Sequence, residues 1–221
     1  LMRLLFSFPM PILLALALNE ITSVRYKKIT QTIIYLPHFI GWVVVYTILQ
    51  GFLSQADGIV NQVIVMFGGK KIPFLASEPW FRPVMILSEI WKEAGWGTVV
   101  YLAALAGIDP AIQEAAMIDG ANRWQRIRYI FLPCILSTVT VMLIMRMGTI
   151  LNNGLEQTLL FQNSMNIDVS EVLETYSYSV GLKQGRFAFG TAIGLFQSVV
   201  GCIMVFVSNF ISKKTGGSGL W

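Results

Sequence analysis

The sequence predicts an all-α integral membrane protein. Of its 221 residues, 55% are hydrophobic and only 13% are charged, whereas a soluble globular domain carries roughly 25% charged residues. The mean hydropathy of +0.64 points the same way. The apolar residues are gathered into runs close to the ~20 residues that a helix needs to cross a bilayer. This composition excludes a disordered chain, a collagen-like fibre and an ordinary cytosolic enzyme.

Five apolar runs are predicted to form a bundle of membrane-spanning helices in one domain over 1–221. The spans cover about 4–18, 33–53, 83–107, 131–151 and 188–211. The first run is short because the chain begins inside it or just before it. Leu1 is not an initiating methionine, and no charged region followed by a cleavage site is present. We therefore expect this sequence to lack an N-terminal part.

The distribution of Lys and Arg among the loops predicts the orientation of the spans. Segments 19–31, 109–130 and 212–221 share one side of the membrane and hold eight basic residues. Segments 54–82 and 152–187 share the other side and hold five. Acidic residues show the opposite bias, four against six. We therefore place the first side, and with it the C-terminus, in the cytoplasm.

Several kinds of chemistry are excluded by residue usage. Cys134 and Cys202 lie in apolar runs, so no disulfide framework is predicted. His38 is the single histidine, and it cannot supply a zinc site or a nucleophile–base pair; beside Pro37 it is expected to be a polar residue at a kinked helix start. No phosphate-binding G-x-x-x-x-G-K-[S/T] loop is present, and the basic residues form no stripe for nucleic acid. We expect no catalytic residue, metal or cofactor on this chain.

One outer loop is expected to contain a short surface helix. In segment 166–186, Asp168 is placed to cap the helix, and Glu171 follows three residues on. Gly181 and Gly185 are expected to interrupt it.

The inner loop is predicted to hold a helix over about 110–120. Asp109 is a good N-cap and Pro110 a good first helical residue, and Gly120 is placed to end the helix. Small alanine side chains would allow the backbone of a partner to come close. Glu114 and Asp119 could meet basic or amide groups on that partner. Three following arginines are expected to anchor the chain to anionic headgroups: Arg123, Arg126 and Arg128.

The same loop resembles the EAA motif of bacterial ABC-importer permeases. The pattern is Glu-Ala-Ala, three residues, Gly, nine residues and then Ile-x-Leu-Pro. Its matching positions are Glu114, Ala115, Ala116, Gly120, Ile130, Leu132 and Pro133, with Asp119 just before the glycine. The resemblance implies a cytoplasmic coupling helix that docks in a groove of a separate ATPase subunit. The alternative is an ordinary interfacial helix between two spans, and the spacing and context favour the coupling helix.

The resemblance extends over nearly the whole chain. Segments 35–45, 90–97, 101–110 and 151–157 are similar to the carbohydrate branch, and most of all to oligosaccharide and polysaccharide permeases of the maltose-type superfamily. Members of that family have six spans, so the first one is missing here. The resemblance implies a multi-pass protein of the bacterial plasma membrane. Its implied partners are a second homologous permease, two ATPase subunits that bind Mg-ATP, and an extracellular binding protein that delivers the oligosaccharide.

Four charged residues fall within the predicted spans: Glu89, Lys92, Glu93 and Arg146. A lone charge at mid-bilayer costs about 2.5–3.5 kcal/mol, so these side chains should face protein or water. The first three share one helix face. They either form an internal ion pair that fixes helix packing, together with Arg146, or line the translocation path and bind sugar hydroxyls or a uronate carboxylate. Both interpretations remain open.

At the outer end of the fourth predicted span, Asn152, Asn153, Glu156 and Gln157 suit hydroxyl recognition or contact with the binding protein. The sequence thus predicts the permease subunit of an ABC importer for an oligosaccharide. One alternative is an importer of another solute, such as a peptide, a polyamine or phosphate. The other is a membrane scaffold or channel, although a channel needs a continuous polar pore face and these spans hold only isolated polar residues.

Overall fold

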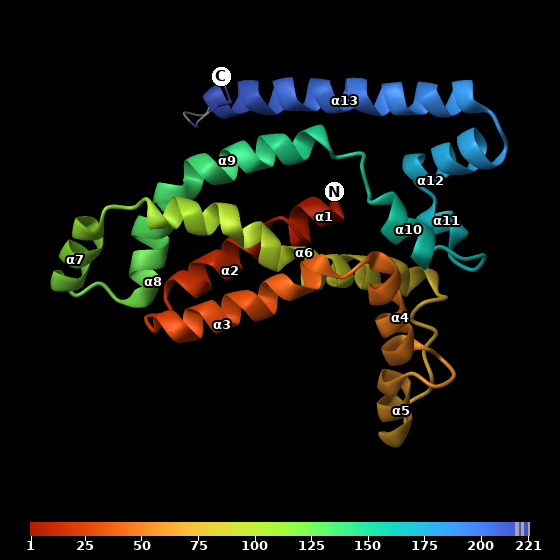
Figure 1. Cartoon of the computed structure of the whole chain (residues 1–221), viewed down its shortest axis with the longest axis horizontal. Coiled ribbons are helices and arrows are strands. Elements are labelled where there is room, and N and C mark those ends of the chain that lie inside the picture. Colours follow the sequence, from red (N-terminus) through yellow and green to blue (C-terminus); the bar gives the residue numbers. More distant parts are fainter. Residues whose placement is uncertain (215–216, 218, 221) are drawn as a thin grey trace. The chain divides into compact units, whose positions relative to one another are not determined.

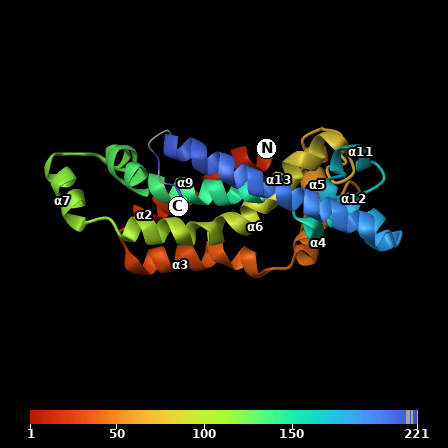
Figure 2. The ribbon, with the colours of Figure 1, turned by 90° about the horizontal axis from the view of Figure 1, so that it is seen from above.

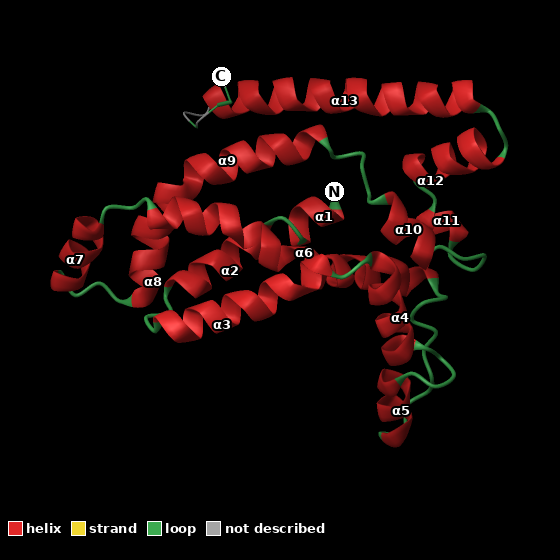
Figure 3. Ribbon diagram, viewed as in Figure 1, coloured by secondary structure: helices red, strands yellow, loops and turns green. Residues whose placement is uncertain are grey.

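The computed structural model describes residues 1–214, 217, 219 and 220. Across these residues the secondary structure is helical and contains no strand (Figure 3), so the predicted all-α class is confirmed. Three helical segments of the described chain are long and apolar enough to cross a membrane: Met2–Asn19, Arg123–Gly148 and Phe187–Lys214. Two bent pairs of helices pass the same test, which gives up to five spans.

The chain forms two compact units. The first comprises Leu1–Phe39, Ile90–Thr149 and Gly201–Trp221, and the second comprises Ile40–Glu89 and Ile150–Val200. Two long helices, α6 (Glu78–Ala106) and α13 (Phe187–Lys214), contribute to both units.

The first unit also contains further helices (Figure 1). It contains α1 (Met2–Phe6), α2 (Pro9–Asn19), α3 (Val24–Tyr35) with the 3₁₀-helix η1 (Leu36–Phe39), α7 (Pro110–Ile118), α8 (Arg123–Arg126), the π-helix η2 (Ile127–Phe131) and α9 (Leu132–Gly148). Its core joins α2, α6 and the start of α9 through Ile12, Ala15, Leu16, Tyr101, Leu105, Phe131 and Ile135. This core fixes the helices that flank the inner loop.

Small residues let the helices of the first unit approach closely. A Cβ at Gly95 would overlap the carbonyl oxygen of Ile34, so α6 and α3 run in backbone contact (Figure 1, Figure 2). A Cβ at Gly201 would likewise overlap the carbonyl oxygen of Gly148, where α13 meets α9. Such close approach is typical of helix packing in membranes.

The second unit holds shorter helices connected by ordered loops. It contains α4 (Trp42–Leu53), α5 (Ile59–Met66), α10 (Leu155–Phe161), α11 (Ile167–Ser170), α12 (Leu173–Ser177) and the π-helix η3 (Tyr178–Lys183), with the first halves of α6 and α13. Its apolar core contains Phe81, Val84, Met85 and Phe161. The run expected as one span over 33–53 is divided at Ile40 and Gly41. Pro37 lies just before this break and has no backbone N–H to donate to a continuing helix.

The structure corrects the expectation for segment 166–186, which is not a single helix. Three short helices occupy it, and Asn166, not Asp168, holds the N-cap position of the first. The Asn166 side chain is fully buried and hydrogen-bonds to the Asn163 N–H and the Phe161 carbonyl. Those contacts fix where the helix begins. Gly181 lies buried inside η3 and does not interrupt it.

Candidate functional site

The inner loop folds locally as its sequence predicts. The Asp109 side chain accepts a hydrogen bond of 2.9 Å from the Ala111 N–H, and Pro110 is the first residue of α7. Helix α7 ends at Ile118, two residues before Gly120, whose φ of +78° few side chains tolerate. The helix is bent by 77° from α6. The loop therefore presents α7 as a separate element at one end of the first unit (Figure 1).

Helix α7 has no buried residue. Three apolar side chains of α7 stay open to solvent: Ile112 in the first turn is 47% exposed, and Met117 and Ile118 in the last turn are 52% and 86% exposed. Among the motif residues, Glu114, Ala115, Asp119 and Gly120 are exposed and Ala116 is half-buried. A short helix with exposed apolar and acidic side chains has a surface suited to docking on another protein.

The second half of the motif lies in an unusual turn. Asn122 and Gln125 form a capping box that begins α8. The π-helix η2 follows, in which the Leu132 N–H reaches back to the Ile127 carbonyl. Ile130 is half-buried in this turn, while Leu132 and Pro133 are exposed at the start of α9. Single π-turns of this kind are rare and occur often at functional sites.

Arg126 makes a contact that the sequence analysis missed. Its Nη2 lies 3.0 Å from the Glu20 carboxylate in the α2–α3 turn, and the two side chains are only 17% and 13% exposed. Arg123 Nε lies 3.9 Å from the same carboxylate but is 72% exposed. The expectation that Arg126 faces lipid headgroups is therefore wrong. The one signal in the sequence was Glu20, the single acidic residue of segment 19–31.

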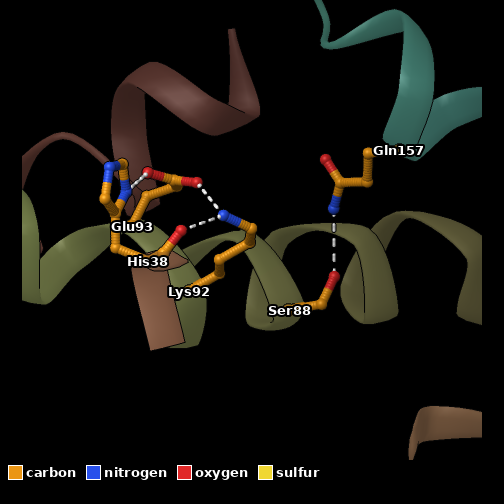
Figure 4. Close-up of polar contacts among 5 residues, drawn as sticks. All are labelled: His38, Ser88, Lys92, Glu93 and Gln157. Atoms are coloured by element: carbon orange, nitrogen blue, oxygen red, sulfur yellow. Dashed lines mark hydrogen bonds and ion pairs between the residues drawn. The ribbon is translucent and has the colours of Figure 1, made fainter. Parts of the chain in front are cut away.

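Lys92 and Glu93 form a polar cluster with His38 in the first unit (Figure 4). The Lys92 ammonium donates to the His38 carbonyl at 2.8 Å and to Glu93 Oε1 at 2.9 Å. The other carboxylate oxygen lies 2.7 Å from His38 Nδ1. The imidazole stacks on Trp96, with ring centroids 4.8 Å apart. The cluster ties α6 to η1, immediately before the break at residues 40 and 41.

The remaining predicted pathway residues are distributed over both units, and Glu89 precedes Lys92 by three residues in α6. Glu89 is a buried residue of α6 in the second unit, and Arg146 is half-buried in α9 of the first. In the second unit, Asn152 and Glu156 are exposed, and the Asn153 N–H donates to the Glu174 carboxylate at 2.6 Å.

Gln157 fastens α10 to α6 within the second unit, because its amide donates to Ser88 Oγ at 3.0 Å (Figure 4) and to the Met85 carbonyl at 2.9 Å. Of the predicted polar residues at this end, Gln157 is thus a packing residue. In the described part of the chain, no group of three His, Cys, Asp or Glu side chains could hold a metal ion.

We expect the substitution Glu93→Gln to destabilise the protein. It removes the carboxylate that lies 2.9 Å from the buried Lys92 ammonium, which should cost about 2 kcal/mol. The measurement is thermal unfolding of the purified protein in detergent. The double variant Lys92→Met/Glu93→Gln removes the buried cation as well, and it should recover part of the loss. An unchanged melting temperature for Glu93→Gln would show that the cluster does not hold these helices together.

Comparison with known proteins identifies the family. The model of the family described as "Binding-protein-dependent transport system inner membrane component" matches residues 7–216. LplB of Bacillus subtilis (strain 168) is 47% identical over 218 residues, which cover 99% of this chain and 69% of LplB. The polygalacturonan/rhamnogalacturonan transport system permease protein YteP of the same organism is 47% identical over 214 residues, covering 97% and 67%.

A solved structure shows the same fold. It is a bacterial alginate ABC transporter in complex with an alginate pentasaccharide-bound periplasmic protein, and one of its chains superimposes with a TM-score of 0.93 at 45% identity. The match covers 99% of this chain and 76% of that one. The resemblance based on the EAA motif is thereby confirmed. This chain belongs to the binding-protein-dependent transport system inner membrane components and is a multi-pass permease subunit of an ABC importer, not itself an enzyme.

Proposed function

We propose that this chain forms part of the translocation path for an oligosaccharide derived from an acidic polysaccharide. The observation that supports the proposal is the similarity, over nearly the whole chain, to YteP and to the alginate transporter. Polygalacturonan and alginate are both polymers of uronic acids. An importer for such material takes up soluble fragments that an extracellular binding protein delivers.

The proposed assembly contains a second homologous permease, two ATPase subunits and the binding protein, in the bacterial plasma membrane. The charge bias of the loops supports an orientation with α7 and the C-terminus on the cytoplasmic side. The exposed side chains of α7 support its docking on an ATPase subunit. The residues assigned to this contact are Glu114, Ala115, Ala116, Asp119, Gly120, Ile130, Leu132 and Pro133.

In this assembly the ATPase subunits supply the energy. When they bind ATP and close, α7 moves with them, and the spans change from an inward-facing to an outward-facing arrangement. The two arrangements must differ by only a few kcal/mol for contacts on α7 to reverse their populations. The chain's own contribution is to transmit the displacement and to form the path.

Six of the predicted pathway residues fall into three pairs. Lys92 and Glu93 neutralise each other and hold η1, which supports a packing role for them. Asn152 and Glu156 are exposed, which supports contact with sugar or with the binding protein. Glu89 and Arg146 remain proposed path residues on the evidence of their charge within the membrane.

The proposal is tested by reconstituting the complete transporter with its binding protein in liposomes and measuring ATP-dependent uptake. The substrates to compare are labelled trigalacturonate, a neutral trisaccharide, and a non-sugar solute such as a dipeptide. We expect uptake of trigalacturonate, little of the neutral sugar and none of the dipeptide. Uptake of the non-sugar solute alone would overturn the proposal.

A further inference from the structure

The second unit contains a pocket that is lined mainly by polar residues. Neither the coupling loop nor the charged residues of the predicted spans contribute to it. Its volume is about 540 Å³, within the range of ~300–1,000 Å³ usual for small-molecule sites. It lies where α4 ends and the following loop turns back, and Asn163 closes its far side. On the predicted orientation this loop faces the side from which the binding protein delivers substrate.

The walls of the pocket are fixed by buried hydrogen bonds. Asn61 is fully buried and holds two loop segments together: its amide donates to the Ser54 carbonyl at 3.0 Å and to the Ile72 carbonyl at 2.9 Å. Its oxygen accepts from the Ile72 N–H at 2.7 Å. The Asn163 amide donates to the Leu75 carbonyl at 2.9 Å. The pocket is therefore formed before any ligand arrives, which lowers the entropic cost of binding.

The side chains that face the pocket are, by contrast, available to a ligand. Within the described residues, Gln50, Gln55 and the carboxylate of Asp57 are exposed and make no side-chain hydrogen bond. The Tyr46 ring is fixed edge-to-face against Phe161, with centroids 5.1 Å apart, while its hydroxyl is likewise unengaged in the described chain. Amides, a phenol and a carboxylate together offer donors and acceptors to a ligand that has several hydroxyl groups.

We propose that this pocket binds one sugar unit of the transported oligosaccharide through its ring hydroxyls as the substrate enters. The proposal rests on the proposed function, because it takes the substrate to be an oligosaccharide. Among the residues that the structure describes, no Lys or Arg lines the pocket, whereas Asp57 does. Asp57 repels a uronate carboxylate inside the pocket, so the ring hydroxyls of the bound unit lie within the pocket and its carboxylate lies outside it.

Gly51 offers a way to fill the pocket without disturbing the fold. It lines the pocket from α4, and a Cβ built there meets no other described residue within 4 Å outside its own stretch of helix backbone. The substitution Gly51→Phe thus adds a ring to the lining of the pocket from a position where the Cβ itself meets no clash. The matched control is Ile48→Phe, since Ile48 is exposed on the same helix and does not line the pocket.

The experiment measures equilibrium binding of labelled trigalacturonate to the assembled transporter in lipid nanodiscs, without binding protein. We expect Gly51→Phe to weaken binding about tenfold or more, as the loss of one or two hydrogen bonds predicts, and Ile48→Phe to change it less than about twofold. Asp57→Asn removes the repulsion between Asp57 and the uronate carboxylates, so it should strengthen binding of trigalacturonate.

Equal binding by Gly51→Phe and wild type would overturn the pocket while leaving the proposed function intact, provided that wild type imports the sugar. A Gly51→Phe variant that binds sugar normally but loses affinity for the binding protein would show that the pocket belongs to that protein contact, and would also overturn the proposal. A wild-type transporter that neither binds nor imports sugar would overturn both.

Discussion

Replacing Gly120 by tryptophan is expected to abolish substrate import while the protein still inserts and assembles in the membrane. Gly120 has a φ of +78°, and a non-glycine residue there costs roughly 1–2 kcal/mol. Apart from the neighbours of Gly120 in sequence, no described residue lies within 4 Å of the new Cβ position, so the added side chain acts on the loop and on whatever docks against it. Import and ATP hydrolysis, measured together in proteoliposomes, should show a loss of import of about tenfold or more.

The matched control is Gly68→Trp. Gly68 has a φ of +81° and equally open surroundings, but it lies in a loop of the second unit. The substitution Gly68→Trp therefore imposes a similar backbone strain at a position outside the coupling loop. Glu114→Lys, which reverses an exposed charge on α7, should give the same loss of import as Gly120→Trp. Normal import by both coupling-loop variants would show that α7 does not transmit the displacement.

Breaking the Glu20–Arg126 pair should destabilise the protein. It should also partly uncouple ATP hydrolysis from import, so that less sugar is imported per ATP hydrolysed. The pair joins α8, which follows the coupling helix, to the turn between α2 and α3. The substitution Arg126→Gln leaves the Glu20 carboxylate, 13% exposed, without its closest cation, at a cost of about 3 kcal/mol. Thermal unfolding measures the first effect, and the amount of sugar imported per ATP hydrolysed measures the second.

Exchanging Glu20 and Arg126 tests whether the ion pair itself supports stability and the coupling of ATP hydrolysis to import. The double variant Glu20→Arg/Arg126→Glu restores an ion pair in reversed order and should recover part of both quantities. Arg128→Gln is the control, because Arg128 is exposed and contacts the ring of its neighbour Tyr129. If Arg126→Gln lowers the melting temperature but keeps the sugar-to-ATP ratio, the pair is a packing contact only.

The inner loop shows where sequence is a sufficient guide to structure. Helix α7 begins at Pro110 after Asp109 and ends before Gly120. An N-cap, an N-terminal proline and a glycine with positive φ determine the ends of a helix through contacts with residues only a few positions away, so the sequence alone predicts them. The apolar runs likewise predict helices, since in a bilayer the backbone must satisfy its hydrogen bonds within each segment.

Long-range contacts decided what the sequence could not. Arg126 resembles its neighbours Arg123 and Arg128 in sequence, yet its partner Glu20 lies 106 residues away. Asn166 displaces Asp168 from the cap position through bonds to Asn163 and Phe161. The pocket beside Gly51 is equally invisible in the sequence, because its walls are joined by Asn61 and Asn163 across loops that show no periodic pattern.

The interleaving of the two units has a consequence for biosynthesis. The first unit is assembled from three stretches of chain, and the second unit lies between them in sequence. On the ribosome, Ile12 and Leu16 of α2 emerge long before Phe131 and Ile135, against which they pack. The early helices therefore lack their packing partners when they enter the membrane. The first unit is complete only after α13 has been translated. Completion of the first unit is thus a late event that depends on α13.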